Sequence, residues 1–276
     1  MTQKAFNYRF YPTPEQETLL RRTMGCTRLV YNRALAMRTE AWYERQERIG
    51  YVESSAMLTQ WKKQEDLSFL NEVSSVVLQQ GLRHLQVAFT NFFAGRAKYP
   101  NFKKKRNGGS AEYTKSGFKF KSGQVYLAKS VEPLAIRWSR QLPSIAEPST
   151  VTVKLLPSGR WTVSLLVDVN IESLPASTNQ IGIDLGVNSL VALSTGEKVS
   201  NPKSFKAKRA KLNIAQRALS RKQKGSNNRY KASLKVAKVH EEISNARKDY
   251  IHKLTTRLVR ENHSYRSRNI SCEEYG

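Results

Sequence analysis

Asp184 is the residue whose setting most favours chemistry. It lies in the stretch QIGIDLGV (residues 180–187), which is apolar up to the acid and has a glycine on each side of it. A short apolar run of this kind predicts a buried strand, and the glycines leave room for another backbone to approach the carboxylate. We therefore expect Asp184 at the edge of a sheet, where a carboxylate either ligates a divalent cation or caps a turn.

Two classes of enzyme place an aspartate in this way. In nucleases of the ribonuclease H-like kind, a strand-end aspartate and further carboxylates hold two Mg²⁺ ions, which clamp the attacking and leaving oxygens of a phosphodiester. Actin-type ATPases have the same GIDLG pattern in their first strand, but they need a second glycine-rich phosphate loop later in the chain. No G-x-G or G-G follows Asp184, so the nuclease interpretation is favoured and the ATPase is the weaker alternative.

Residues 203–260 form a strongly basic stretch with helical periodicity. They contain eighteen lysines and arginines but three acids, Glu241, Glu242 and Asp249. Solvated helices usually mix charges so that residues four apart attract each other, whereas residues 203–238 contain no acid. Such helices repel themselves unless phosphates neutralise them, so we expect contacts with a nucleic-acid backbone, which position a protein without reading sequence. The predicted contact residues are Lys206, Lys208, Arg209, Lys211, Arg217, Arg221, Lys222, Lys224, Arg229, Lys231 and Lys235.

A second basic segment follows Tyr99-Pro100 and is predicted to be a loop, because it contains Gly108-Gly109. Aromatic residues adjoin its positive charges, a combination that suits the backbone and bases of nucleic acid. Simple solubility of a surface loop explains the charges equally well. The candidate binding residues are Lys103, Lys104, Lys105 and Arg106.

Composition narrows the partners further. The 276 residues include 47 Lys and Arg against 22 Asp and Glu, a formal net charge of +25, which favours a polyanionic partner. The basic stretch lacks tryptophan and a broad apolar face, so nucleic acid is favoured over a membrane surface. The two cysteines, Cys26 and Cys272, exclude a disulfide framework and a cysteine-based zinc site within this chain. Without a secretory signal pattern or an apolar run of spanning length, we expect a cytoplasmic protein.

The first part of the chain predicts a small β-barrel interrupted by helices. Phe6, Tyr8 and Phe10 alternate as on one face of a strand, and Thr13-Pro14-Glu15-Gln16 has the capping box of a helix start. Helical periodicity continues to residue 94, with an expected break at Gly25. Short alternating runs follow, among them a hairpin of residues 151–155 and 161–167.

The second part predicts strands followed by a helical hairpin. Residues 173–179 are expected to be a linker, and residues 180–200 to contain three short strands, the first ending near Asp184. Residues 225–228, with the sequence GSNN, divide the basic stretch into two helices, each with one narrow apolar stripe. The fold class is therefore α+β with several domains: a β-barrel with an inserted helical bundle, then strands and a basic helical hairpin.

These pieces together resemble TnpB, the family of transposon-encoded RNA-guided DNA endonucleases related to type V CRISPR effectors. The resemblance extends from the first strand to about Asn262 and rests on the order and spacing of several short motifs. These motifs are FYPTPEQ (residues 10–16), GCTR (25–28), VYN (30–32), PNFK (100–103), GRWTVS (159–164), GIDLGV (182–187) and the basic hairpin ending in HKL (252–254).

The resemblance implies a domain order and a chemistry. It implies a wedge-like β-barrel of residues 1–12 and 100–178, a helical recognition lobe of residues 13–99, and a RuvC nuclease domain of ribonuclease H-like fold over residues 179–276, with its helical hairpin at 203–260. Asp184 falls on the first RuvC acid of the family, a Mg²⁺ ligand. The implied partners are a guide RNA and a double-stranded DNA target, with base pairing rather than protein contacts reading the sequence.

The sequence departs from the family after Asn262. There the family continues with a buried strand bearing a glutamate, a four-cysteine zinc element and a third acid, whereas residues 263–276 match none of these. We expect a C-terminally truncated, incomplete RuvC domain with an aberrant tail at 263–276 and an exposed sheet edge. A frameshift is one hypothesis, since residues 264–268 can be encoded so that the +1 frame reads Ala-Ile-Val-Val-Glu. With a single acid, the chain is expected to bind nucleic acid without cutting it, and a non-catalytic regulator is the alternative function.

Overall fold

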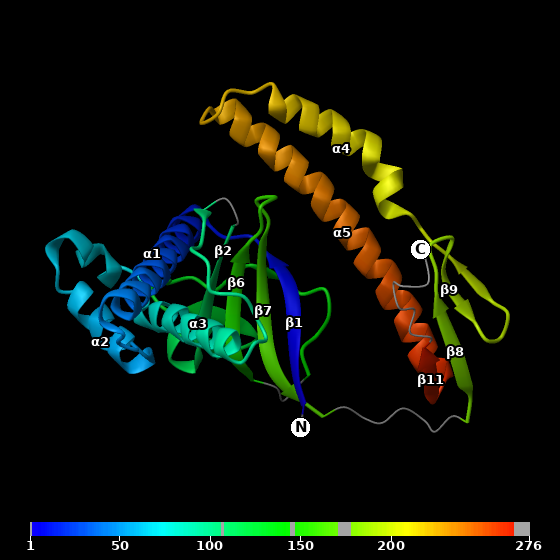
Figure 1. The fold of residues 1–276 in the computed structure, drawn as a ribbon, viewed down its shortest axis with the longest axis horizontal. Helices are drawn as coiled ribbons and strands as arrows, with labels where there is room; N and C mark the ends of the chain where they lie inside the picture. Colours follow the sequence, from blue (N-terminus) through cyan, green and yellow to red (C-terminus); the bar gives the residue numbers. More distant parts are fainter. Residues whose placement is uncertain (1, 106–107, 144–146, 171–177, 268–276) are drawn as a thin grey trace. The chain divides into compact units, whose positions relative to one another are not determined.

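The computed structural model describes residues 2–105, 108–143, 147–170 and 178–267. The chain divides into two compact units, residues 1–171 and 172–276, which are drawn in Figure 1. Both units combine sheets with helices, so a mixed fold is confirmed. Across the described ranges, no helix is long and apolar enough to cross a bilayer. The expected linker at 173–179 lies largely outside the described residues, since only residues 178 and 179 of it are described.

The first unit is built on a five-stranded antiparallel sheet. Its strand order is β2-β6-β7-β1-β5, and a separate two-stranded sheet pairs β3 with β4. The expected hairpin is confirmed, because β6 and β7 pair along their length around a tight turn at Gly159, whose φ is +81°. The strands are β1 (Thr2–Phe10), β2 (Gly109–Thr114), β3 (Phe118–Lys121), β4 (Gln124–Leu127), β5 (Ile136–Arg137), β6 (Pro148–Leu155) and β7 (Trp161–Val169).

Strand β1 carries the aromatic face that the sequence predicts. Phe6, Tyr8 and Phe10 are all buried, and they pack in one core with residues of β6 and β7. Val125 of β4 belongs to the same core, so both sheets enclose it. This alternation of inward apolar and outward polar residues is the period of a half-buried strand.

Three α-helices and a short 3₁₀ helix form a second core in the first unit. Its interior includes Leu35, Trp61 and Leu82, which come from three different helices. Helix α3 packs closely on α1 at Gly81, where an added Cβ would lie only 3.0 Å from the Thr27 Cγ2. The helices are α1 (Pro14–Arg45), α2 (Tyr51–Trp61), the 3₁₀ helix η1 (Glu65–Asn71) and α3 (Ser75–Phe93).

Helix α1 confirms one prediction and corrects another. Thr13 and Gln16 form the expected capping box, with the Gln16 amide donating to Thr13 Oγ1 at 3.3 Å and the Thr13 amide donating to Gln16 Oε1 at 3.2 Å. The expected break at Gly25 is wrong, since the helix runs unbroken from Pro14 to Arg45. One glycine costs a helix only about 1 kcal/mol relative to alanine, and burial of its neighbours Met24 and Cys26 outweighs that cost.

The second unit contains a four-stranded sheet of order β10-β9-β8-β11. Strands β8, β9 and β10 are antiparallel, and β11 runs parallel to β8. Part of the tail expected to be aberrant, residues 264–267, forms β11 and pairs with β8; β11 is itself an edge strand, and its Tyr265 is 43% exposed. The strands are β8 (Gln180–Leu185), β9 (Ser189–Leu193), β10 (Lys198–Ser200) and β11 (Ser264–Ser267).

Two long helices complete the second unit. Helices α4 (Ser204–Ser220) and α5 (Asn227–Glu261) form the expected hairpin and lie side by side in Figure 1. Near its end, α5 covers one face of the sheet, where Leu258 packs with Ile181 and Val191. Tyr250 of α5 also donates its hydroxyl hydrogen to the Ser200 carbonyl oxygen at 2.7 Å. The sheet and the basic hairpin therefore form one continuous unit.

Candidate nucleic-acid interface

Asp184 lies near the end of β8, on the face of the sheet that α5 does not cover. The strand alternates, so Ile181 and Ile183 point toward the core with Leu258, while Asp184 points to the other face. The carboxylate is exposed, and its cross-strand neighbour is Ala192 of β9. The strand position predicted for Asp184 is confirmed; its catalytic role stays a prediction.

A reciprocal contact fixes the backbone just before Asp184. The Gly182 amide donates to Ser194 Oγ at 2.9 Å, and the Ser194 amide donates to the Gly182 carbonyl oxygen at 2.9 Å. A Cβ added at Gly182 would lie 3.2 Å from the Ser194 Cβ, so glycine allows this close approach. These two hydrogen bonds therefore hold in place the strand segment that carries the Asp184 carboxylate.

Two cations share the open face with Asp184. Lys198 of β10 pairs with Ala192, and Arg266 of β11 pairs with Gly182, so both occupy the face on which Asp184 lies. Within the described part of the chain, neither one forms an ion pair with Asp184. The sequence analysis did not identify these two residues, because their pairing with Asp184's neighbours arises from strand register alone.

The donor set around Asp184 does not suit a Mg²⁺ site. Among the residues that the structure describes, no three His, Cys, Asp or Glu side chains gather as metal ligands would. Mg²⁺ takes octahedral oxygen coordination, commonly with one or two carboxylates and substrate phosphates, and a two-metal site needs several carboxylates. Asp184 supplies one carboxylate between two cations, so no step of a metal-dependent reaction follows from this arrangement.

The basic hairpin presents most of its cations to solvent. Its own core is narrow and consists of Leu212 from α4 with Val239 and Ile243 from α5. Nine of the predicted contact residues are exposed, and Lys208 and Arg229 are half-buried. The exposed ones are Lys206, Arg209, Lys211, Arg217, Arg221, Lys222, Lys224, Lys231 and Lys235.

An acid from the opposite helix offsets two of these cations, contrary to the expectation that none would. Lys208 Nζ lies 2.7 Å and Lys211 Nζ 3.1 Å from Glu242 Oε2. Their hydrogen bonds, that of Lys208 above all, lower the pKa of the Glu242 carboxyl. Glu242 lies 31 or more residues away in sequence, so counting charges four residues apart could not reveal the pair.

Arg229 has a structural contact of its own. Its Nη1 donates to the carbonyl oxygens of Leu219 at 3.2 Å and of Lys222 at 2.8 Å. These carbonyls lie at and just beyond the end of α4, where helices leave such oxygens without an intrahelical partner. Arg229 therefore ties the start of α5 to the end of α4.

The loop after Pro100 holds Lys103 firmly. Asn32 of α1 accepts from the Lys103 amide at 2.8 Å and donates to the Lys103 carbonyl oxygen at 3.0 Å. The Lys103 ammonium lies 4.0 Å from the centroid of the Tyr31 ring, and its local desolvation lowers the pKa of this lysine although the residue as a whole is exposed. Lys104 and Lys105 are exposed, and Arg106 lies outside the described residues.

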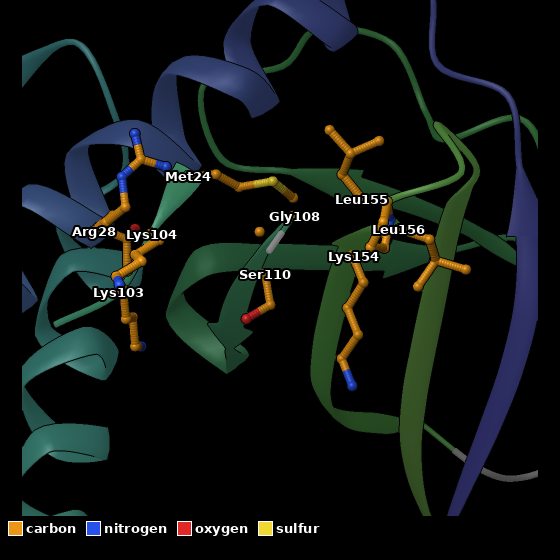
Figure 2. A pocket seen from close by; sticks show the side chains of 12 residues that line it. Met24, Arg28, Lys103, Lys104, Gly108, Ser110, Lys154, Leu155 and Leu156 are labelled. Atoms are coloured by element: carbon orange, nitrogen blue, oxygen red, sulfur yellow. The ribbon is translucent and has the colours of Figure 1, made fainter. Parts of the chain in front are cut away.

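Lys103 and Lys104 also line a hollow of about 330 Å³ in the first unit. Figure 2 shows them with Arg28 on one side of the hollow and Lys154 on the other. Sequence reasoning did not assign Arg28 or Lys154 to any site. Arg28 lies on α1 and Lys154 on β6, more than a hundred residues apart in the sequence, so no local pattern predicts that the two line one hollow.

Comparisons with known proteins identify the family. Residues 163–271 match the IS605 OrfB family described as "Probable transposase", and residues 1–47 match a family described as "Helix-turn-helix domain". In the structure those first residues form β1 and the single long helix α1. A solved complex of Cas12f1 with guide RNA and target DNA shares the fold, with a TM-score of 0.55 and 11% identity over 98% of this chain and 81% of that chain.

Two curated relatives are both named "Putative RNA-guided DNA endonuclease". The relative from Streptomyces pristinaespiralis is 60% identical over 94% of this chain, and InsQ from Escherichia coli is 34% identical over 95%. The chain spans 65% and 64% of the lengths of these two relatives. The chain belongs to the IS605 OrfB transposase family, the family of the TnpB-like proteins.

Proposed function

We propose that this chain is the nucleic-acid-binding portion of a transposon-associated, RNA-guided DNA endonuclease. The names of its relatives support this function, and the Cas12f1 neighbour was solved with guide RNA and target DNA bound. The proposed partners are accordingly a guide RNA and a double-stranded DNA target. Base pairing would select the target while the protein holds the backbone by shape and charge.

The observation that carries the proposal is the row of exposed cations along α4 and the start of α5. Nine of the eleven contact candidates in residues 203–238 are exposed, and Lys208 and Lys211 form ion pairs with Glu242 of the opposite helix. A phosphate backbone neutralises such a surface and releases its own counterions, which supplies the binding free energy. Lys206, Lys231 and their exposed neighbours are thus the proposed backbone contacts.

The proposed domain roles follow the two cores of the first unit. The helical core of α1, α2 and α3 supports a recognition lobe of residues 13–99, and the strand core supports a wedge-like barrel of residues 1–12 and 100–178. We assign the sheet and hairpin from residue 179 onward to the first part of a RuvC domain, with Asp184 as its first acid.

These 276 residues are proposed to bind nucleic acid without cutting it. Asp184 is one exposed carboxylate on a sheet face that also carries Lys198 and Arg266, and one carboxylate offers a Mg²⁺ ion too few oxygen ligands. The same observation favours the second candidate function, a non-catalytic regulator that occupies guide RNA or transposon-end DNA. Neither candidate cuts DNA. The first binds a guide RNA together with its DNA target, whereas the second occupies guide RNA or transposon-end DNA alone.

The test combines binding with cleavage. The full chain is incubated with RNA transcribed from the transposon end and with a supercoiled plasmid carrying the matching target, in Mg²⁺ and in EDTA. We expect RNA binding that does not require Mg²⁺, and no nicking above that of Asp184→Asn. Nicking that requires Mg²⁺ and disappears in Asp184→Asn would contradict the non-cutting proposal, and failure to bind any nucleic acid would contradict the function as a whole.

A further inference from the structure

The hollow between α1, β2 and the turn after β6 is a second concentration of positive charge, separate from the basic hairpin. Arg28, Lys103, Lys104 and Lys154 line it, and none of its twelve lining residues, all of them described, is acidic. Glu112 of β2 interacts with Lys154 from outside the lining, so the four cations leave an excess of positive charge that a bound anion would stabilise.

One of the four cations, Lys103, is held in place by its neighbours. Asn32 holds the backbone of Lys103 through both its amide and its carbonyl, and the Tyr31 ring supports the ammonium at 4.0 Å. Partial desolvation lowers the pKa of Lys103, and an anion beside it would raise that pKa again. Binding of an anion and protonation of Lys103 therefore favour each other.

Two glycines, Gly108 and Gly109, also line the hollow. Gly108 has a φ of +81°, and a Cβ there would lie 2.4 Å from the Leu155 carbonyl oxygen. At Gly109 a Cβ would lie 2.7 Å from Met24 Sδ. The two glycines therefore let β2 pack closely against Leu155 and Met24, which brings these two residues to the border of the hollow.

The remaining lining is apolar or hydroxylic. Met24, Leu155 and Pro157 supply apolar surface, and Ser110 and Thr27 supply hydroxyl groups. In Figure 2 Met24 and Leu155 border the hollow above Gly108, and Ser110 lies below it. Its volume of about 330 Å³ is at the lower end of the range of small-ligand pockets, about 300–1,000 Å³.

We propose that this hollow binds one nucleotide, with the phosphate held by Arg28, Lys103 and Lys154 and the sugar or base resting on Met24, Leu155 and Pro157. Arginine pairs with phosphate oxygens through two parallel hydrogen bonds, and lysine contributes a compact charge. The nucleotide is either free or part of a nucleic-acid strand. In the second case the inference rests on the proposed function; in the first it stands independently of it.

The test uses the full chain and calorimetric titration with three probes: AMP, adenosine and a short single-stranded oligonucleotide. We expect AMP to bind at least about tenfold more tightly than adenosine, since each charge-assisted contact to phosphate is worth roughly that factor. The variant Arg28→Gln/Lys154→Gln removes two such contacts and should lose at least about tenfold in AMP affinity. The matched control Lys119→Gln/Lys121→Gln removes two exposed charges from β3 of the same unit and should leave AMP binding unchanged.

The three probes identify the source of the nucleotide. AMP binding that the pocket variant weakens indicates a free nucleotide; oligonucleotide binding that the pocket variant weakens, without AMP binding, indicates a strand. Equal binding of AMP and adenosine, or no response of either phosphate probe to the pocket variant, would overturn the proposal. Because Arg28 is half-buried on α1, Lys154→Gln alone, at an exposed position, carries the test if the double variant melts at a lower temperature.

A hairpin variant distinguishes failure of the pocket proposal from failure of the proposed function. Loss of three hairpin cations, in Arg217→Gln/Arg221→Gln/Lys222→Gln, should weaken RNA binding and leave AMP binding intact. If the hairpin variant has no effect on RNA while the pocket variant abolishes AMP binding, the pocket stands and the proposed role of the hairpin fails.

Discussion

The two units of this chain use positive charge differently. In the first unit, cations lie over deep cores and are held in place, as Lys103 is by Asn32 and Tyr31. In the second unit, the hairpin carries its cations on two long helices whose own core consists of Leu212, Val239 and Ile243. The comparison indicates that the first unit is stabilised by burial, whereas the hairpin gains much of its stability when a polyanion neutralises it.

The largest expected effect comes from truncating each core. Leu82 of α3 is 1% exposed and packs among the helices of the first unit, so Leu82→Ala should lower the free energy of unfolding of that unit by about 2–5 kcal/mol. Ile243→Ala should instead open the hairpin locally, because few other buried residues hold it together. Hydrogen exchange measured by mass spectrometry separates the two responses.

A surface substitution supplies the control for the core variants. Ile214 of α4 is 68% exposed, so Ile214→Ala should leave exchange in the hairpin unchanged. If Ile243→Ala also accelerated exchange in β6 and β7 of the first unit, the two units would not be independently stabilised and the comparison would fail.

Alkaline pH should affect the first unit next most strongly. Burial raises the pKa of Tyr113 to about 12 in the folded chain, above the ordinary value near 10. The stability that follows is fully present below pH 10 and is lost as pH rises toward 12, a loss of about 3 kcal/mol. Equilibrium unfolding between pH 9 and 12 measures it, and Tyr113→Phe should reduce the alkaline loss; burial also raises the pKa of Tyr8 and Tyr31, which account for the remainder. A Tyr113→Phe protein that keeps the same alkaline loss would contradict this assignment.

A smaller effect is expected where the hairpin offsets its own charge. Glu242→Gln removes the acid that pairs with Lys208 and Lys211, so the free hairpin should become less stable and its affinity for RNA should rise. Because the pKa of Glu242 is lowered, the stabilisation is present above the ordinary pKa of glutamate and is lost as pH falls through the folded value. Melting curves at pH 3 to 7 check this sign. Weaker RNA binding by Glu242→Gln would mean that Lys208 and Lys211 do not face the nucleic acid.

Local patterns in the sequence predicted the parts of the fold that local contacts determine. The capping box at Thr13, the β6–β7 hairpin and the division between α4 and α5 all depend on residues within a few positions of one another. For the same reason the local apolar run before Asp184 predicted correctly that this residue belongs to a strand, β8.

Contacts between distant residues explain what the sequence could not predict. The unbroken helix at Gly25 depends on packing against α3 and the sheet, and β11 forms because β8 offers it an edge. Lys211 pairs with Glu242, and Arg28 and Lys154 line one hollow, although the members of each pair lie far apart in the chain. No periodic pattern in the sequence predicts that such distant residues come together, so these arrangements become visible only in the folded structure.

The salt dependence of RNA binding tests the central claim most directly. If about six hairpin cations contact phosphates, log K should fall against log salt with a slope of about −4 to −5, and Arg217→Gln/Arg221→Gln/Lys222→Gln should make the slope shallower by about 2 to 3. The equally charged control Lys115→Gln/Lys119→Gln/Lys121→Gln, on exposed positions of the first unit, should leave the slope near its original value. Equal slopes for the parent chain and the hairpin variant would contradict the account.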